Sequence, residues 1–447
     1  MPRKWVSLGT DVDAAWGECQ GSANDPYQTR IDLSEPAFKC SCPSRKFPCK
    51  HALGLFLLLA QQPAVFSQCG RPDWVDEWLG SRRERAEKKE QRREAGAAAA
   101  AADPAAQARR AAEQARRAEA REDKVARGLD ELDRFLRDLV RQGLATVRDK
   151  PYSFWDAPAA RLVDAQAPGL ARRLQELAGV ASADGRWQEK VLERLGRLHV
   201  IIEGYRHIAA LPSDMQADLR AAIGFTVPQE DVLSGTGVRD QWLVLGQRVH
   251  EEDRLRTQRT WLWGQACRRA ALILHFAPAG QPLDISLVPG TALAAEVVYF
   301  PASYPQRALI KTRLSNPRSL SEVLPAPRRE READGNGHGT VATALARCAE
   351  ALATQPLLET FPLWLETVVP VRIAGGWNLR DEDGRLMPLE RGCGGTEWML
   401  AALSGNAPID VFGEWDGDAL RALSAWVDGR LVRCSWPDPV GAQDLEG

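Results

Sequence analysis

The sequence has no apolar run long enough to cross a membrane. Its longest strongly apolar stretch, ALGLFLLLA at 52–60, has nine residues, whereas a membrane-spanning helix needs roughly 20. The N-terminus, MPRKWVSLGTDVD, also lacks the apolar core and the small-residue cleavage site of a secretory signal peptide. These absences indicate a cytoplasmic protein in which the stretch 52–60 forms a buried helix.

Arrangements typical of catalytic sites are also missing. No spacing in the sequence assembles a Ser/His/Asp set, a Cys/His pair for nucleophilic attack or a pair of carboxylates. The glycine-rich stretch GNGHG at 335–339 lacks the lysine and Ser/Thr of a phosphate-binding loop, so we interpret it as a flexible connector. We therefore expect a protein that is not an enzyme.

What the sequence does contain is a cluster of three cysteines and one histidine. Cys40 and Cys42 form a C-x-C pair, and Cys49 and His51 form a C-x-H pair that follows it. Three thiolates and one imidazole are a complete tetrahedral ligand set for zinc, which in structural sites is closed by four protein ligands. Because no position is left for a metal-bound water, we expect a structural zinc site and no metal catalysis.

Other uses of the cysteines remain open. The cluster could be a set of buried thiols without metal or could contain a disulfide, although a reducing compartment disfavours the disulfide. Cys19 and Cys69 flank the cluster and are interpreted as small core residues, with a role as ligands as the alternative. The remaining cysteines have no paired spacing and are interpreted as small core residues: Cys267, Cys348, Cys393 and Cys434.

The spacing C-x-C-x6-C-x-H resembles the SWIM-type zinc finger. The resemblance includes an extended segment before the cluster, YQTRIDL at 27–33, and an apolar helix directly after His51. The runs SCPSRKFPCKHALGL and AARLVDAQAPGLARRL are similar to bacterial members of this family. The resemblance implies a short β-hairpin plus helix built on one Zn²⁺, with binding of DNA or protein partners and no catalytic residue. By position it implies the ligands Cys40, Cys42, Cys49 and His51.

Basic residues surround the expected ligands, and no acidic residue occurs between Lys39 and His51. These cations could serve only to offset the charge of roughly −1 that three thiolates leave on zinc. Alternatively, they form an exposed face that meets phosphate or an acidic protein surface. The second hypothesis predicts contacts to nucleic acid or to a partner protein through Arg30, Lys39, Arg45, Lys46 and Lys50.

The composition changes sharply between residues 81 and 123, where there is no aromatic residue and no apolar residue larger than alanine. Such a segment cannot bury a core. Its Ala, Arg, Glu and Gln favour helix, which predicts two solvated helical pieces broken near Asp103 and Pro104. The composition is coiled-coil-like, yet no heptad of large apolar residues is sustained. Residues 82–127 hold 14 Lys/Arg against nine Asp/Glu, so the segment is either a spacer or a basic arm that touches nucleic acid.

Apolar residues recur at spacings of three and four along 129–144 and again along 187–208. This periodicity predicts amphipathic helices that pack as a bundle. His199, Glu203 and His207 lie on the second long helix, where a metal site is possible but ordinary core or surface histidines are favoured.

After residue 227, aromatic and β-branched runs alternate with Gly/Pro clusters, which predicts strands of antiparallel sheets. The run EWMLAALSG at 397–405 is also interpreted as a strand, and 340–353 as a helix. Trp242, Trp261 and Trp263 are expected in the core, with a base-stacking platform as the alternative.

These patterns predict an α+β multidomain protein with a zinc-stabilised β-hairpin plus helix, a helical linker and bundle, and C-terminal mixed antiparallel-sheet domains. The expected function is zinc binding, with the finger recruiting nucleic acid or protein partners. The alternative is a protein–protein scaffold whose zinc is purely structural and whose C-terminal domains contact partners. The expected boundaries are 1–80 for the SWIM-type domain (finger about 26–60), 81–124 for the charged Ala-rich linker, 125–226 for the helical bundle, 227–325 for the antiparallel sheet domain and 326–447 for the α+β C-terminal domain.

Overall fold

The structure is a computed structural model. It describes residues 4–21, 25–34, 37–44, 48–67, 70–101, 104–182, 186–252, 255–278, 281–323, 339–391 and 395–434. Arg45, Lys46, Cys69, Cys393 and residues 335–338 of the glycine-rich stretch lie outside these ranges. The chain divides into two compact units, Met1–Arg116 with Ala277–Ser286 and Arg117–Phe276 with Leu287–Gly447. None of the described helices combines the length and the apolar character that a membrane span requires.

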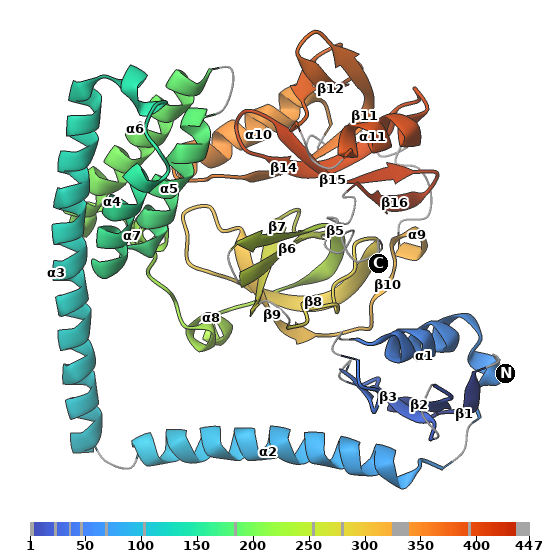
Figure 1. The fold of residues 1–447 in the computed structure, drawn as a ribbon. Helices are drawn as coiled ribbons and strands as arrows, with labels where there is room; N and C mark the ends of the chain where they lie inside the picture. The colour runs from blue at the N-terminus through green and yellow to red at the C-terminus, as the bar shows by residue number, and fades with distance from the viewer. Residues whose placement is uncertain are drawn as a thin grey trace. The chain divides into compact units, whose positions relative to one another are not determined.

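The first unit contains a four-stranded antiparallel meander in which sequence neighbours pair. The strands are β1 (Trp5–Thr10), β2 (Ala14–Cys19), β3 (Tyr27–Asp32) and β4 (Ala37–Cys40). The predicted hairpin corresponds to β3 and β4, and β1 and β2 extend it into a sheet. Helix α1 (Lys50–Gln61) packs on one face of this sheet, where Leu55 meets Leu8, Ala15 and Ile31 in a small apolar core (Figure 1).

The other face of the meander is covered by the start of helix α2 (Asp73–Ala101). Val75 and Trp78 of α2 pack against Ala14 and Trp16 of β2. This explains why the helix starts before the charged segment. Its first turns bury apolar side chains against the sheet, whereas the alanine-rich continuation has no large apolar side chain to bury. Helix α3 (Pro104–Gln142) follows and runs without interruption past residue 124 into the bundle, while the predicted break at residues 102–103 lies outside the described residues.

The second unit begins with the helical bundle that the periodicity predicts. The C-terminal half of α3 packs with four further helices around a core that includes Leu129, Trp155, Leu174 and Ile202. These helices are α4 (Ser153–Asp164), α5 (Pro168–Ser182), α6 (Trp187–Arg206) and α7 (Ser213–Ile223), and the short helix α8 (Gln229–Ser234) follows. Two of the connections contain 3₁₀ turns, at Leu144–Val147 and Ile208–Ala210.

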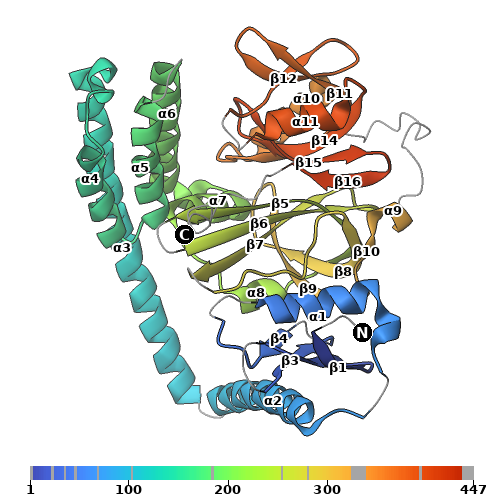
Figure 2. The ribbon, with the colours of Figure 1, turned by 45° about the vertical axis from the view of Figure 1, so that its right-hand side comes forward.

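A six-stranded sheet follows the bundle, in the order β10-β8-β5-β6-β7-β9. Because β9 also pairs with β8, five of the strands close into a barrel (Figure 2). The pairing of β7 with β9 is parallel, so the predicted antiparallel domain has one parallel seam. The elements are β5 (Val238–Glu252), β6 (Leu255–Gly264), β7 (Ala270–Pro278), β8 (Thr291–Tyr299), β9 (Arg307–Arg313), β10 (Arg318–Ser319) and helix α9 (Leu320–Val323).

The C-terminal part is a second six-stranded sheet, ordered β13-β12-β11-β14-β15-β16 and antiparallel throughout. Helices α10 and α11 contribute to the apolar core on one of its faces. The elements are α10 (Val341–Thr354), β11 (Phe361–Ile373), β12 (Gly376–Arg380), β13 (Leu386–Pro388), α11 (Thr396–Ser404), β14 (Ile409–Trp415), β15 (Leu420–Val427) and β16 (Arg430–Arg433).

Helix α11 corrects one sequence expectation, because the run EWMLAALSG is helical and not a strand. Met399, Leu400 and Leu403 are strong helix formers as well as apolar residues, and a short apolar run does not distinguish helix from strand by periodicity. Gly395 and Gly405, both at positive φ, bound the helix. Glycine tolerates that backbone conformation.

The barrel packs against the C-terminal sheet through large apolar side chains. Trp261 and Trp263 of the barrel share a core with Trp364 and Phe412 of the sheet. Trp242 lies in a separate core that includes Leu262 and Leu293 of the barrel. The three tryptophans singled out from the sequence are therefore core residues, with 0%, 0% and 6% of Trp242, Trp261 and Trp263 exposed. They offer no stacking platform.

Candidate metal centre

The first two residues of the cluster lie where strand β4 ends. Cys40 is the last residue of β4 and Cys42 follows it in the turn. The turn is fixed by a pair of contacts with Gln28, whose carbonyl accepts from the Ser41 N–H and whose own N–H donates to the Ser41 hydroxyl. Both sulfurs therefore lie beside the N-terminal end of β3.

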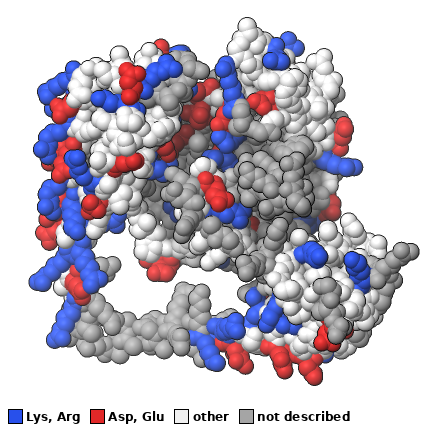
Figure 3. All heavy atoms as spheres, viewed as in Figure 1, with Lys and Arg blue, Asp and Glu red and all other residues white. Residues whose placement is uncertain are grey.

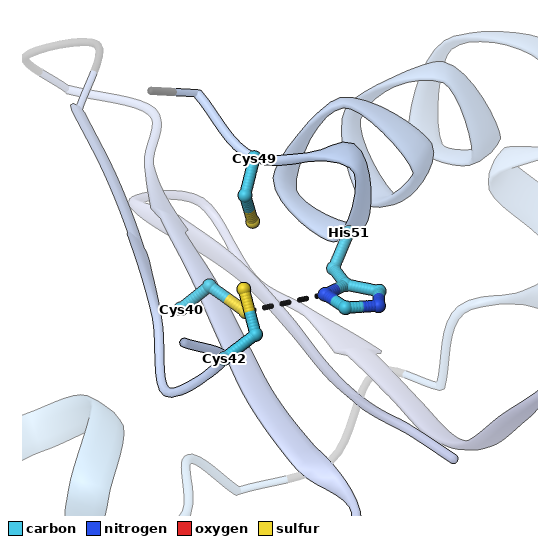
Figure 4. A group of neighbouring side chains, drawn as sticks. All are labelled: Cys40, Cys42, Cys49 and His51. Atoms are coloured by element: carbon cyan, nitrogen blue, oxygen red, sulfur yellow. Dashed lines mark hydrogen bonds between the residues drawn. The ribbon is translucent and has the colours of Figure 1, made fainter. Parts of the chain in front are cut away.

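The other two residues lie at the N-terminus of α1. Cys49 is the N-cap of this helix, and its sulfur accepts a hydrogen bond from the backbone N–H of Ala52 at 3.4 Å. His51 lies in the first turn of α1. The C-x-H pair thus spans the point at which the chain enters the helix, so that Cys49 and His51 turn toward the same point (Figure 4).

The four ligand atoms all lie within 4.8 Å of one another. The Cys40 sulfur is 3.8 Å from Nδ1 of His51, and Figure 4 shows the sulfurs of Cys42 and Cys49 directed to the same space. A tetrahedral zinc ion with ordinary bond lengths separates a sulfur ligand from a nitrogen ligand by about 3.6 Å. The residues present therefore fit zinc in number, chemical type and separation.

The surroundings lower the pKa of one ligand, His51, and raise the pKa of another, Cys40. The pKa of His51 lies below its usual value because burial disfavours the imidazolium ion and because Lys50 and Lys4 add positive charge. A neutral imidazole is the form that binds a metal. Burial raises the pKa of the Cys40 thiol to about 12. A metal ion that replaces this proton would supply the positive charge that a buried thiolate lacks.

Cys42 differs from Cys40. Burial alone would raise its pKa, but the N–H of Ser44 and the thiols of Cys40 and Cys49 donate to its sulfur, and the net effect lowers its pKa. The Cys42 thiol, with its lowered pKa, therefore loses its proton more readily than the Cys40 thiol, whose pKa is raised.

Two residues that the sequence analysis did not single out support the ligands. The Thr29 hydroxyl lies 3.2 Å from the Cys40 sulfur, and Thr29 is completely buried. The ring of Tyr27 lies against that of His51, with centroids 5.1 Å apart. The register of β3 against β4, which pairs Thr29 with Cys40, brings the hydroxyl to the sulfur, and a C-x-C spacing gives no sign of it.

The described cations near the cluster do not share one surface. Arg30 pairs with Lys39 across β3 and β4. Because side chains alternate along a strand, both project from the sheet face opposite that of Thr29 and Cys40. Arg30 is half-buried there, with its guanidinium 5.1 Å and 5.8 Å from the rings of Trp74 and Trp78 of α2, and burial lowers its pKa. Lys39 is exposed.

Lys50 is also exposed and lies in the first turn of α1, close enough to shift the pKa of His51. Arg45 and Lys46 lie outside the described residues. Of the two alternative ligands, Cys19 is buried near the end of β2 and does not belong to the ligand cluster, while Cys69 lies outside the described residues.

A second group that could hold a metal ion consists of Asp133, His199 and Glu203 in the bundle. The carboxylate of Asp133 already forms ion pairs with Arg137 and Arg206, at 3.0 Å and 3.3 Å. The charge that a cation would have to supply is thus provided by arginine. We interpret these residues as a structural ion-pair network, as the sequence analysis favoured for His199.

Comparison with known proteins gives two family matches. The SWIM zinc finger matches residues 30–60, which include all four ligands, and the SWIM-associated four-helix bundle domain matches residues 120–223, from within α3 to the end of α7. No curated protein and no solved structure matches the chain.

Proposed function

Because this chain is a SWIM-type zinc-finger protein, we propose that Cys40, Cys42, Cys49 and His51 hold one structural zinc ion and that the finger recruits a nucleic acid without catalysing a reaction. The single observation that carries the proposal is the convergence of the four ligand atoms within 4.8 Å. Bound zinc supplies a closed tetrahedral centre with no free coordination position.

The ligands join two parts of the finger that share little apolar surface. Cys40 and Cys42 belong to the edge strand β4 and its turn, while Cys49 and His51 belong to α1. The core between sheet and helix is small, so the free energy of metal binding contributes directly to folding. A finger held in this way presents the side chains of its first helical turn in a fixed position.

Exposed lysines support a polyanionic partner. Lys39 and Lys50 are both exposed, and within the described part of the chain neither forms an ion pair. Contact between such a lysine and a nucleic-acid phosphate is favourable, because it releases counterions that are condensed on the nucleic acid. Helix α3 displays further Lys and Arg side chains interspersed with Asp and Glu (Figure 3).

The test is a salt titration of the zinc-loaded protein with single- and double-stranded DNA and RNA oligonucleotides. If Lys39 and Lys50 each neutralise one phosphate, log K should fall as log salt rises, and each of Lys39→Gln and Lys50→Gln should make this slope shallower by about one unit. Lys150→Gln, which removes a lysine in contact with Phe154 of the bundle, is the matched control. Absence of measurable binding at about 50 mM salt would eliminate the nucleic-acid proposal.

One observation favours a protein partner as the second candidate. Leu53, Phe56 and Leu57 of α1 are 46%, 46% and 53% exposed, and neighbouring exposed apolar side chains on one helix are typical of protein contacts. The protein would then be a scaffold with a purely structural zinc. In that case Leu57→Ser should weaken capture of the partner, and the lysine variants should leave it unchanged.

A further inference from the structure

The second unit contains an open cavity of about 470 Å³. Its wall is formed by α7, the segment 300–307 that leads into β9, and the segment 355–360 after α10. This volume is within the range of small-molecule sites in proteins. All of its lining residues belong to the second unit, so it is distinct from the zinc finger.

The charged residues of the wall are mostly paired. Four arginines and two carboxylates line the cavity. Arg173 pairs with Glu359 at 2.7 Å, and Arg259 pairs at 2.9 Å with Glu414, which lies outside the wall. Arg220 lies 3.7 Å from Glu122. The charges of these three arginines are therefore offset by named carboxylates.

Arg307 is different. Within the part of the chain that the structure describes, no carboxylate lies within ion-pairing distance of its guanidinium, which packs 4.2 Å from the centroid of the Phe300 ring. Arg307 is exposed to solvent, yet the protein packed around its guanidinium removes part of its hydration and lowers its pKa. A side chain in the wall of an open cavity is expected to be partly surrounded by protein and still to contact water, as Arg307 is.

The neighbouring side chain also lacks a partner. Nε2 of Gln306 is buried and has no hydrogen-bond partner among the described residues, although the Gln306 carbonyl accepts from the Leu272 N–H at 2.7 Å. A buried amide donor left unpaired costs about 1–3 kcal/mol, so such groups in native proteins call for an explanation. Gln306 lines the cavity beside Arg307, and a rotation of its side-chain amide would bring this donor to a ligand acceptor there.

Apolar side chains form part of the wall, beside polar ones such as Asp218, Gln355 and Thr360. Phe225, Phe300 and Tyr304 contribute rings, and Leu272 and Leu357 contribute aliphatic groups. Apolar walls with a few polar groups at one place are typical of sites that fix the orientation of a small ligand. Among the polar groups of this wall, Arg307 is a cation without a carboxylate partner among the described residues, and Gln306 carries the unpaired N–H donor.

We propose that this cavity binds a small organic anion, whose carboxylate or phosphate meets Arg307 and Gln306 and whose apolar body lies against Phe225, Phe300 and Tyr304. The proposal does not depend on the function of the zinc finger. It gives the C-terminal half of the chain a ligand-binding role that neither family match covers, since the matches end at residue 223.

The test uses two probes with related bodies, anionic anilinonaphthalene sulfonate and neutral phenylnaphthylamine, titrated by fluorescence into the full-length zinc-loaded protein. The sulfonate should bind at a saturable site, and Arg307→Gln should weaken its binding roughly ten- to a hundredfold, because a charge-assisted contact is lost. Binding of the neutral probe should change little. Arg430→Gln removes the same charge from an exposed position on β16 and should change neither.

A second variant keeps the test decisive if Arg307→Gln folds poorly. Gln306→Leu removes the unpaired donor, so it should leave the melting temperature unchanged or raise it while weakening sulfonate binding by roughly fivefold. Displacement of the sulfonate by benzoate or phenyl phosphate would support the proposal. Equal sulfonate affinity in the wild type and both variants, or displacement by neither competitor, would overturn it.

Discussion

Thr29 and Cys40 face each other across β3 and β4, with the threonine hydroxyl 3.2 Å from the sulfur. Because Thr29 is completely buried, its hydroxyl has few alternatives to this contact. A hydroxyl in this place stabilises the thiolate over the thiol and so favours the metal-binding form of Cys40. The register of β3 against β4 thereby influences the protonation of a residue of the candidate metal centre.

Thr29→Val should therefore weaken zinc binding while keeping the shape of the buried side chain. Loss of a hydrogen bond to a metal ligand typically lowers affinity by about 10- to 100-fold, and competition with a chromophoric chelator measures the change. Thr10→Val is the matched control, because the Thr10 hydroxyl donates to the Ala14 carbonyl and to no ligand. If both variants bound zinc as tightly as the wild type, Thr29 would have no part in the site.

Cys42→Ser should remove most of the zinc. Elemental analysis should find one zinc per wild-type chain and a much lower content in the variant, because three ligands remain and the hydroxyl is a poor substitute for a thiolate. Cys267→Ser, which changes a half-buried cysteine of the barrel unit, should retain the full content. Equal zinc in the wild type and Cys42→Ser would contradict the ligand assignment.

Glu414→Gln should destabilise the second unit. Glu414 is 3% exposed and accepts from Arg248, Arg259 and the indole N–H of Trp261 at 2.6, 2.9 and 2.7 Å. Removing its charge leaves two arginines without their carboxylate, at a cost of about 3 kcal/mol. Urea denaturation followed by tryptophan fluorescence measures the loss. Glu193→Gln, which breaks only the surface pair with Arg197, should cost about 0.5 kcal/mol or less.

The same carboxylate predicts how stability depends on pH. The pKa of Glu414 is lowered: burial opposes ionisation, but the charges of Arg259 and Arg248 and the hydrogen bonds outweigh it. A lowered pKa in the folded state means that the contribution is fully present above the unfolded value, about 4.5. It is lost as the pH falls through the folded value. The stability difference between wild type and Glu414→Gln should be constant near neutral pH and shrink in acid; a constant difference down to about pH 3 would contradict this.

Trypsin should cut the chain first between residues 82 and 123. The described side chains of this segment are largely exposed and rich in arginine, and cleavage concentrates where little structure must be lost. The products should be a finger fragment that retains zinc and a stable body that begins near Val125, which is completely buried in the bundle. Resistance of this segment with cleavage near Gly339 instead would reject the division. Mass spectrometry of early time points identifies the cuts.

The sequence predicted the parts of the molecule that depend on neighbours along the chain. The cluster from Cys40 to His51 lies within one turn and one helix start, so spacing was enough to predict that these four side chains come together. The helices of the bundle could be predicted for the same reason, because each has apolar residues along one face of its own sequence. Helix α11 was wrongly predicted because a nine-residue apolar run has no flanking signal strong enough to choose between helix and strand.

Features that depend on distant pairings could not be predicted. Closure of the barrel needs β8 beside β9 and β9 beside β7, and no local pattern encodes which strands meet. The stacking of Arg30 on Trp74 joins β3 to α2 and changes the interpretation of a residue that looked like a surface cation. The cavity proposed to bind an anion likewise brings Arg307 and Gln306 together with residues of the bundle.

The ion pairs of Glu414 with two arginines affect the order in which parts of the chain can fold during synthesis. Its partners Arg248 and Arg259 precede it by 166 and 155 residues. A chain that emerges from the ribosome N-terminus first can fold its finger and bundle early, since domains fold as units in that order. The two arginines must stay hydrated until β14 has been made, because burying them earlier would leave both charges uncompensated. Water can therefore be excluded from this part of the second unit only after β14, which carries Glu414, has been synthesised.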